Sequence, residues 1–185
     1  MQRGRVALRV VPVGGTDFHR DEEPLSLESA FRRYSPYVAA IALRLLGRDD
    51  EVDDVVQDVF LSAVKGFSQI RDPKAAKAWL ATVTVRVARR RLRVRRLKAV
   101  FGFEDLAHID EPVAAGASPE ERALLSRVYG VLDRIPVEQR LAWVLRHIEG
   151  EKLEDVARLV GCSLATAKRR ISAAQGAIEE ALSDG

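Results

Sequence analysis

The sequence contains a single cysteine, Cys162, among 185 residues. One thiol excludes an intramolecular disulfide and any metal site built from several cysteines, and it fits a reducing compartment. No stretch approaches the roughly 18 uninterrupted apolar residues of a membrane-spanning helix. The apolar run at residues 6–13 is broken by Arg9 and Pro12, and no small-residue cleavage site of a signal peptide follows it. We therefore expect a cytoplasmic protein.

Patterns that carry catalysis or hold cofactors are missing as well. The three histidines lie in separate segments without metal-ligand spacing. Neither a GxxxxGK[ST] nor a GxGxxG phosphate-binding loop occurs. Cys162 has no local base that would make it a nucleophile. We expect a protein without enzymatic activity, metal or cofactor.

The charges are nearly balanced in number but not in position. Lys and Arg total 30 against 27 Asp and Glu, so the formal net charge is +3, and 47% of the residues are apolar. These fractions are ordinary for a folded globular protein, and the length allows one medium domain or two small ones. Because the charges lie in blocks of opposite sign, we expect separate basic and acidic surfaces.

The periodicity of the apolar residues is helical throughout. Residues 1–25 hold several glycines and prolines without sustained periodicity, so we expect a flexible N-terminal extension and assign it no role. Apolar residues recur at three- and four-residue steps within 26–98 and again within 119–185. Residues 99–118 are acidic and contain glycine and proline. The predicted fold is all-α, with two small helical domains joined by a flexible acidic linker.

Single residues mark several of the expected helix ends. Gly47 and Gly150 are expected stops, and Pro73 and Pro119 are expected first helical residues.

The segment LEDVARLVGCSLATAKRRI, residues 153–171, has the pattern of a helix-turn-helix. A short helix is followed by a turn at Gly161, a cap at Ser163 and a second helix with a basic outer face. Side chains on that face can reach base edges or phosphates in a major groove; they are Ala165, Thr166, Lys168, Arg169, Arg170 and Ser172. The expected buried stripe is Leu164, Ala167, Ile171, Ala174 and Ile178. The alternative is a helical hairpin with a solvated basic face.

A second basic segment, RVARRRLRVRRLK, carries eight cations in the thirteen residues 86–98. On a helix of 3.6 residues per turn, four arginines lie within about 80° of one another, opposite Val87 and Val94. We call these four, Arg86, Arg89, Arg93 and Arg96, the basic ridge. Gathering like charges disfavours an isolated helix, a cost that a polyanion such as nucleic acid offsets. A merely solvated basic helix is the alternative.

Two further features flank the basic ridge in the sequence. Trp79 lies just upstream, where an aromatic side chain either stacks an unpaired base or belongs to the core. An acidic face on the preceding helix would repel DNA, so it favours a protein partner, although a solubilising surface has the same pattern. This acidic face consists of Asp50, Asp54, Gln57, Asp58 and Leu61.

Taken together, residues 27–97 and 119–182 resemble the extracytoplasmic-function (ECF) group of bacterial RNA polymerase sigma factors. DDVVQDVFLSAVKGF is similar to the family's E-D-L-V-Q-E-x-F-L helix, and KAWLATVTVRVARRRLR to its F-x-A-W-L-x-x-I-A-R-N-x-x-x-D-x-x-R segment. In the second domain, LDRIPVEQRLAWVLRHIEGEKLEDVARLVGCSLATAKRRISAAQGAI resembles the family's L-P-x-x-x-R block and the helix-turn-helix that follows it.

The resemblance implies a role for each domain. The first would bind the clamp helices of the polymerase largest subunit through Asp54, Gln57 and Asp58. It would also capture and melt the minus-10 promoter element, which assigns DNA contacts to Trp79, Arg86, Arg89, Arg90 and Arg93. The second would read the minus-35 element through Ser163, Ala165, Thr166, Lys168, Arg169 and Arg170.

Further partners follow from the same resemblance. The acidic linker would thread toward the active-site and RNA-exit channels of core polymerase. Members of the family are often held inactive by an anti-sigma factor that covers both binding faces, so such a protein is a further expected partner.

The sequence departs from the family pattern at several of these positions. Arg86 and Arg90 stand where asparagine and aspartate are common, Ala167 and Arg169 replace valine and serine, and Gln175 replaces arginine. These departures bear on base preference more than on the overall role.

Two other classes of protein account for part of the sequence: a stand-alone helix-turn-helix regulator and a helical adaptor for acidic proteins. Both would bind their targets without polymerase.

Overall fold

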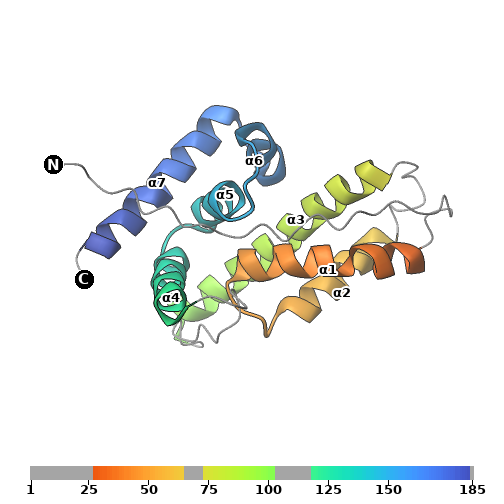
Figure 1. The fold of residues 1–185 in the computed structure, drawn as a ribbon, viewed down its shortest axis with the longest axis horizontal. Helices are drawn as coiled ribbons and strands as arrows, with labels where there is room; N and C mark the ends of the chain where they lie inside the picture. The colour runs from red at the N-terminus through yellow and green to blue at the C-terminus, as the bar shows by residue number, and fades with distance from the viewer. Residues whose placement is uncertain (1–26, 65–72, 103–117, 184–185) are drawn as a thin grey trace.

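The computed structural model describes residues 27–64, 73–102 and 118–183, in which every regular element is an α-helix (Figure 1). The first group of helices is α1 (Leu27–Leu46), α2 (Val52–Ala63) and α3 (Pro73–Val100). The second group is α4 (Pro119–Arg134), α5 (Val137–His147), α6 (Leu153–Val160) and α7 (Leu164–Ser183). The all-α, two-domain prediction is confirmed. The expected N-terminal extension and most of the expected linker lie outside the described residues.

The expected helix ends are confirmed by their backbone geometry. Gly47 has φ 72° directly after α1, and Gly150 has φ 73° before α6; both angles lie in the left-handed region that favours glycine. At the start of α4, the Ser118 side chain accepts a hydrogen bond from the Glu121 amide while the Glu121 carboxylate accepts one from the Ser118 amide. This reciprocal pair is a capping box, and Pro119 occupies the first turn.

Helix α3 is buried on two sides, because it contacts α1 and α2 of the first domain and α5 and α6 of the second (Figure 1). Every side chain from Leu80 to Ala88 is buried, except those of Thr82 and Arg86. The buried Thr84 hydroxyl donates to the Leu80 carbonyl oxygen at 2.8 Å, which satisfies the one polar group in this stretch of the core. Apolar burial on α3 ends at Leu92, so Val94, which the helical periodicity places with Val87 opposite the basic ridge, is 47% exposed.

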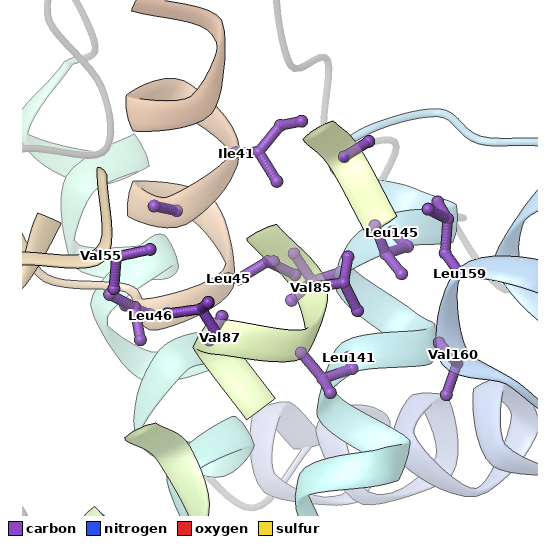
Figure 2. Packing of buried hydrophobic residues seen from close by; sticks show 14 of the residues in the cluster. Ile41, Leu45, Leu46, Val55, Val85, Val87, Leu141, Leu145, Leu159 and Val160 are labelled. Carbon is purple, nitrogen blue, oxygen red and sulfur yellow. The ribbon is translucent and has the colours of Figure 1, made fainter. Parts of the chain in front are cut away.

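The two domains share one apolar core. Leu45 of α1, Val85 of α3 and Leu141 of α5 lie close together in Figure 2, with Leu145 and Leu159 of the second domain beside them. All of these side chains are buried. The packing of the second domain on the first was not predicted, because the sequence suggested domains connected through the linker.

Hydrogen bonds from the second domain cap the C-terminal end of helix α1. The Tyr129 hydroxyl donates to the Arg44 carbonyl oxygen at 2.7 Å, and the Arg140 guanidinium donates to the carbonyl oxygens of Leu45 at 2.9 Å and Leu46 at 2.6 Å. The last carbonyls of a helix have no partner within it and carry partial negative charge. The second domain therefore supplies the C-terminal cap of α1.

Arg140 is 1% exposed, and its charge is balanced by the Asp133 carboxylate of its own domain. Burial lowers the pKa of the Arg140 guanidinium, while Asp133 acts in the opposite direction. At the same place, a Cβ atom on Gly47 would overlap the Tyr129 ring and lie 3.1 Å from Arg140 Nη2. Gly47 thus has two constraints, a positive φ and a close approach of the second domain.

Candidate nucleic-acid interface

The helix-turn-helix forms as predicted, with one correction. Gly161 has φ 66° between α6 and α7, and the Thr166 amide donates to Ser163 Oγ at 3.2 Å. Val156, Ala157 and Val160 of α6 are buried together with Ala167, Ala174 and Ile178 of α7. The prediction that Leu164 is buried is wrong: it is 40% exposed, because it is the first residue of α7 and the buried positions begin one turn later.

Helix α7 presents two free cations near its N-terminal end. Lys168 and Arg169 are exposed, as is Ala165 between them and the turn. Neither cation has a hydrogen-bond or ion-pair partner among the described residues. Ser163 and Thr166 are exposed or half-buried and are joined by a hydrogen bond of 2.9 Å between their hydroxyl oxygens. Apart from Arg170, the predicted side chains therefore lie on the exposed surface at the start of α7, with the two hydroxyls contributing to the helix cap.

Arg170 and Gln175 of α7 face the protein instead. Arg170 Nη1 lies 3.8 Å from the Glu138 carboxylate of α5. Gln175 Oε1 accepts a hydrogen bond of 2.7 Å from Trp143 Nε1, and Trp143 is 4% exposed. The departure from the family pattern at Gln175 thus has a structural explanation, because a buried indole nitrogen needs an acceptor.

The basic ridge lies against the second domain. Arg89 Nη2 donates to the Val160 carbonyl oxygen at 2.7 Å, Arg93 Nη2 donates to Glu138 Oε1 at 2.6 Å, and Arg96 donates to the Ile135 carbonyl oxygen. Arg86 remains exposed. Of the four predicted ridge arginines, three therefore have their guanidinium groups engaged across the domain interface.

The acidic face of α2 contacts another row of α3 arginines. Arg91 donates to Asp58 at 2.9 Å and to Asp54 at 3.2 Å, and Arg90 lies 3.2 Å from Asp58. The hydrogen bond with Asp58 raises the pKa of Arg91. Part of the acidic face thus holds α2 against α3, and Arg91 is a residue of this site that the sequence analysis missed.

An apolar hollow of about 550 Å³ opens beside the acidic face. It is lined by Phe31, Val56, Phe60, Leu61 and Val64, with Glu28, Asp53 and Gln57 at its polar positions. Leu61 is 61% exposed and Val64 is 51% exposed. Exposed apolar surface bordered by polar side chains is typical of a protein-binding site.

Trp79 is half-buried and packs against the shared core. This placement agrees with the core alternative for the indole ring, and Trp79 lies on α3 about two turns before the run of arginines that begins at Arg86. Glu138 is a second residue that the sequence analysis missed. Its one signal in the sequence is an acidic position in the first turn of a helix that follows Pro136.

Two negative findings hold for the described parts of the chain. No helix there is long and apolar enough to cross a membrane. Histidine, cysteine and carboxylate side chains in residues 27–64, 73–102 and 118–183 form no group that could hold a metal ion.

Comparison with known families and proteins identifies both domains. Residues 30–98 match the model of Sigma-70 region 2, and residues 125–174 match that of Sigma-70 region 4. The ECF RNA polymerase sigma factor SigM of Mycobacterium tuberculosis is 30% identical over 157 residues, which cover 85% of this chain and 77% of that protein. The ECF RNA polymerase sigma-E factor of Escherichia coli is 28% identical, over 80% of this chain and 81% of its own.

A solved structure agrees with these sequence matches. The sigma factor RpoE of Bartonella quintana, in complex with the anti-sigma factor NepR, superposes with a TM-score of 0.62 at 26% identity, covering 84% of this chain and 96% of that one. CnrH, solved with the cytosolic domain of CnrY, has the same fold, with a TM-score of 0.56 at 24% identity. The chain belongs to the ECF family of RNA polymerase sigma factors.

Proposed function

We propose that this sigma factor directs core RNA polymerase to its promoters through three surfaces, acting by binding and without covalent catalysis. The observation that carries the proposal is the order of two sigma-70 regions along one chain, residues 30–98 and 125–174. A stand-alone regulator needs the second region but has no use for the first. Polymerase and promoters are cytoplasmic, which is the location we infer for this chain.

The first surface is the acidic face of α2, which we assign to the clamp helices of the polymerase largest subunit. Gln57 is exposed and borders the apolar hollow, and Asp54 is exposed beside it. A basic, amphipathic partner helix would find carboxylates and apolar surface side by side here. Asp58 belongs to the same surface, and its carboxylate also contacts Arg90 and Arg91 of α3.

The second surface, on α3, is assigned to the minus-10 element through Trp79, Arg86, Arg89, Arg90 and Arg93. Arginines supply phosphate contacts, and a partly exposed indole ring can stack an unpaired base. The third surface, on α7, is assigned to the minus-35 element, with Lys168 and Arg169 as the exposed cations and Ser163, Ala165 and Thr166 around them. Arg170 is assigned to the same surface from its edge, where it contacts Glu138. Lysine and arginine on a recognition helix read guanine edges or hold phosphates.

We also infer an anti-sigma partner. The RpoE structure from Bartonella quintana holds a sigma factor together with the anti-sigma factor NepR. The match covers most of this chain and most of the matched chain. A protein that covers the α2 and α3 surfaces would prevent polymerase and DNA from binding them.

The test is the binding of the labelled full-length chain to purified bacterial core polymerase, followed by fluorescence anisotropy. Asp54→Arg is expected to abolish saturable binding, because it places a cation where a basic partner docks. The control is Arg91→Ala, which breaks the same Arg91–Asp54 contact of 3.2 Å and also the Arg91–Asp58 contact of 2.9 Å, but keeps both carboxylates. If Arg91→Ala loses binding and Asp54→Arg keeps it, the assignment of the acidic face is wrong.

An absence of binding by the folded wild-type chain would favour the second candidate, a stand-alone helix-turn-helix regulator. That candidate should bind its DNA target tightly without polymerase. Circular dichroism of each variant establishes that the helices are intact before the comparison is made.

A further inference from the structure

The apolar hollow beside the acidic face lies at the beginning of the described chain. Two of its lining residues, Glu28 and Phe31, belong to the first two turns of α1, which begins at Leu27. The rings of Phe31 and Phe60 contact each other edge to face, with their centroids 4.9 Å apart. The volume of about 550 Å³ is within the range of about 300–1,000 Å³ that is usual for ligand pockets. The hollow is therefore large enough to take several side chains of a partner segment.

Carboxylates border this apolar hollow. Glu28 and Asp53 belong to its lining and are exposed, as is Asp54 on the neighbouring acidic face. Glu28 forms an ion pair of 2.8 Å with Arg32, whereas Asp53 has no hydrogen-bond or ion-pair partner among the described residues. Complementary charge across an interface fixes which partner is accepted. The hollow therefore favours an occupant that is both apolar and basic.

One segment of this chain, outside the described residues, has that composition. Residues 3–13, RGRVALRVVPV, contain three arginines and no acidic residue. The match to Sigma-70 region 2 begins only at residue 30, so the segment has no part in the surfaces assigned above. Successive side chains of an extended chain point to opposite sides, which places Val6, Leu8 and Val10 on one side. The segment thus combines an apolar side with positive charge.

The connection from this segment to α1 is long enough for the segment to reach the hollow. Thirteen residues, 14–26, lie between the segment and Leu27. At about 3.3 Å per residue they span up to about 40 Å, and the lining of the hollow starts at Glu28, the second residue of α1. A tethered ligand has an effective concentration of millimolar order when its linker can span the distance. Even a weak contact would therefore fill the hollow.

We propose that residues 3–13 dock in the apolar hollow, with the side that carries Val6, Leu8 and Val10 against its apolar lining and the arginines beside its carboxylates. A further consequence rests on the proposed function. The docked segment covers the apolar part of the surface assigned to the clamp helices, so polymerase has to displace it. The segment and a basic, amphipathic clamp helix offer the same chemistry and exclude each other there.

The test measures, by fluorescence anisotropy, how a fluorescein-labelled peptide with the sequence of residues 3–13 binds to the full chain. Leu8→Asp with Val10→Asp in the chain should leave the hollow empty. The matched control, Ala7→Asp with Val11→Asp, makes the same change in net charge on the other side of the segment. The first variant is expected to bind the peptide about tenfold more tightly than the control, as for a tenfold rise in the fraction of chains with a free hollow.

A second pair of substitutions tests the hollow itself. Leu61 lines it, whereas Ser62, the next residue of α2, is exposed and does not. Each change is added to the chain that carries Leu8→Asp with Val10→Asp. Leu61→Asp should abolish binding of the peptide, and Ser62→Asp should leave it unchanged. Circular dichroism of each variant establishes that the helices are intact.

Absence of peptide binding, or equal binding by the two segment variants, would overturn the docking and leave the proposed function intact. A dimer in size-exclusion chromatography that Leu61→Asp dissociates would overturn it in favour of a second copy of the chain.

Binding to core polymerase separates the docking from the proposed function. Leu8→Asp with Val10→Asp should raise the affinity for polymerase about tenfold over the control with Ala7→Asp and Val11→Asp. If the peptide requires Leu61 but the two segment variants bind polymerase equally, the docking is supported and the assignment of the hollow to the clamp helices is wrong.

Discussion

The basic side chains of α3 and of α7 have the same pattern in the sequence and different surroundings in the structure. Both helices carry cations opposite an apolar stripe. On α3, three of the four arginines of the basic ridge contact oxygen atoms of the second domain. On α7, Lys168 and Arg169 are exposed and have no partner among the described residues.

The difference follows from the number of buried sides of each helix. Helix α3 contacts helices of both domains, whereas α7 packs on α4, α5 and α6 of its own domain. A helix buried on two sides has little free circumference, so three of its ridge arginines contact protein oxygens, while Arg86 stays exposed and Arg93 keeps 61% of its side chain exposed. A run of arginines therefore predicts a basic helix, and its packing decides whether the charge is available to DNA.

The largest expected effect on this comparison comes from Arg140, which holds the second domain on α1. Arg140→Ala removes hydrogen bonds to Leu45 and Leu46 and leaves the half-buried Asp133 with one partner fewer. Removing one member of a buried ion pair typically costs about 3–5 kcal/mol. We expect a loss of this size in the free energy of unfolding, measured by urea unfolding.

The matched control for this change is Arg134→Ala, because Arg134 is exposed at the end of α4. Surface substitutions of this kind usually change stability by less than about 0.5 kcal/mol. Similar unfolding midpoints for the two variants would contradict the assignment of Arg140 to the interface.

A second, smaller effect is expected where Gly47 approaches Tyr129. Gly47→Ala and Gly150→Ala both place a side chain at positive φ, at a cost of about 1–2 kcal/mol each. At Gly47 the new Cβ also overlaps the Tyr129 ring, whereas at Gly150 no described atom lies within 4 Å. Overpacking adds about 1–3 kcal/mol, so thermal unfolding should separate the two variants. Equal losses would mean that the second domain does not press on Gly47.

The third expected effect concerns Gln175, which lies on the same helix as the cations of α7 but contacts Trp143 of its own domain. Gln175→Ala leaves the buried Trp143 Nε1 without its acceptor, and an unsatisfied buried donor costs about 1–3 kcal/mol. We expect this loss in urea unfolding and no change in the salt dependence of DNA binding. A flatter salt dependence for this variant would assign Gln175 to the DNA surface instead.

The sequence predicted the helices because their ends carry local signals. The positive φ of Gly47 and Gly150 and the capping box at Ser118 are properties of single residues and their nearest neighbours. The helix-turn-helix was predictable for the same reason, from the turn at Gly161 and the cap at Ser163. Leu164 was misplaced, because periodicity alone does not say at which turn packing begins.

The packing of the two domains was not predictable in the same way. Arg140 is the largest of the fully buried side chains, although an arginine in a sequence ordinarily indicates surface. A usable signal was present in α3, where LATVTVRVA offers apolar or small side chains around most of the helix. That composition indicates burial on two sides. The partners of the individual arginines depend on contacts between residues far apart in the chain.

The most direct test of the contrast between α3 and α7 is the salt dependence of DNA binding by the free chain in two double variants. Lys168→Ala with Arg169→Ala should flatten the plot of log affinity against log salt by about 1.8, since each lost phosphate contact contributes about 0.9. Arg89→Ala with Arg93→Ala should leave the slope of the free chain unchanged, because Val160 and Glu138 already occupy those guanidinium groups. An equal flattening by both double variants would contradict the account.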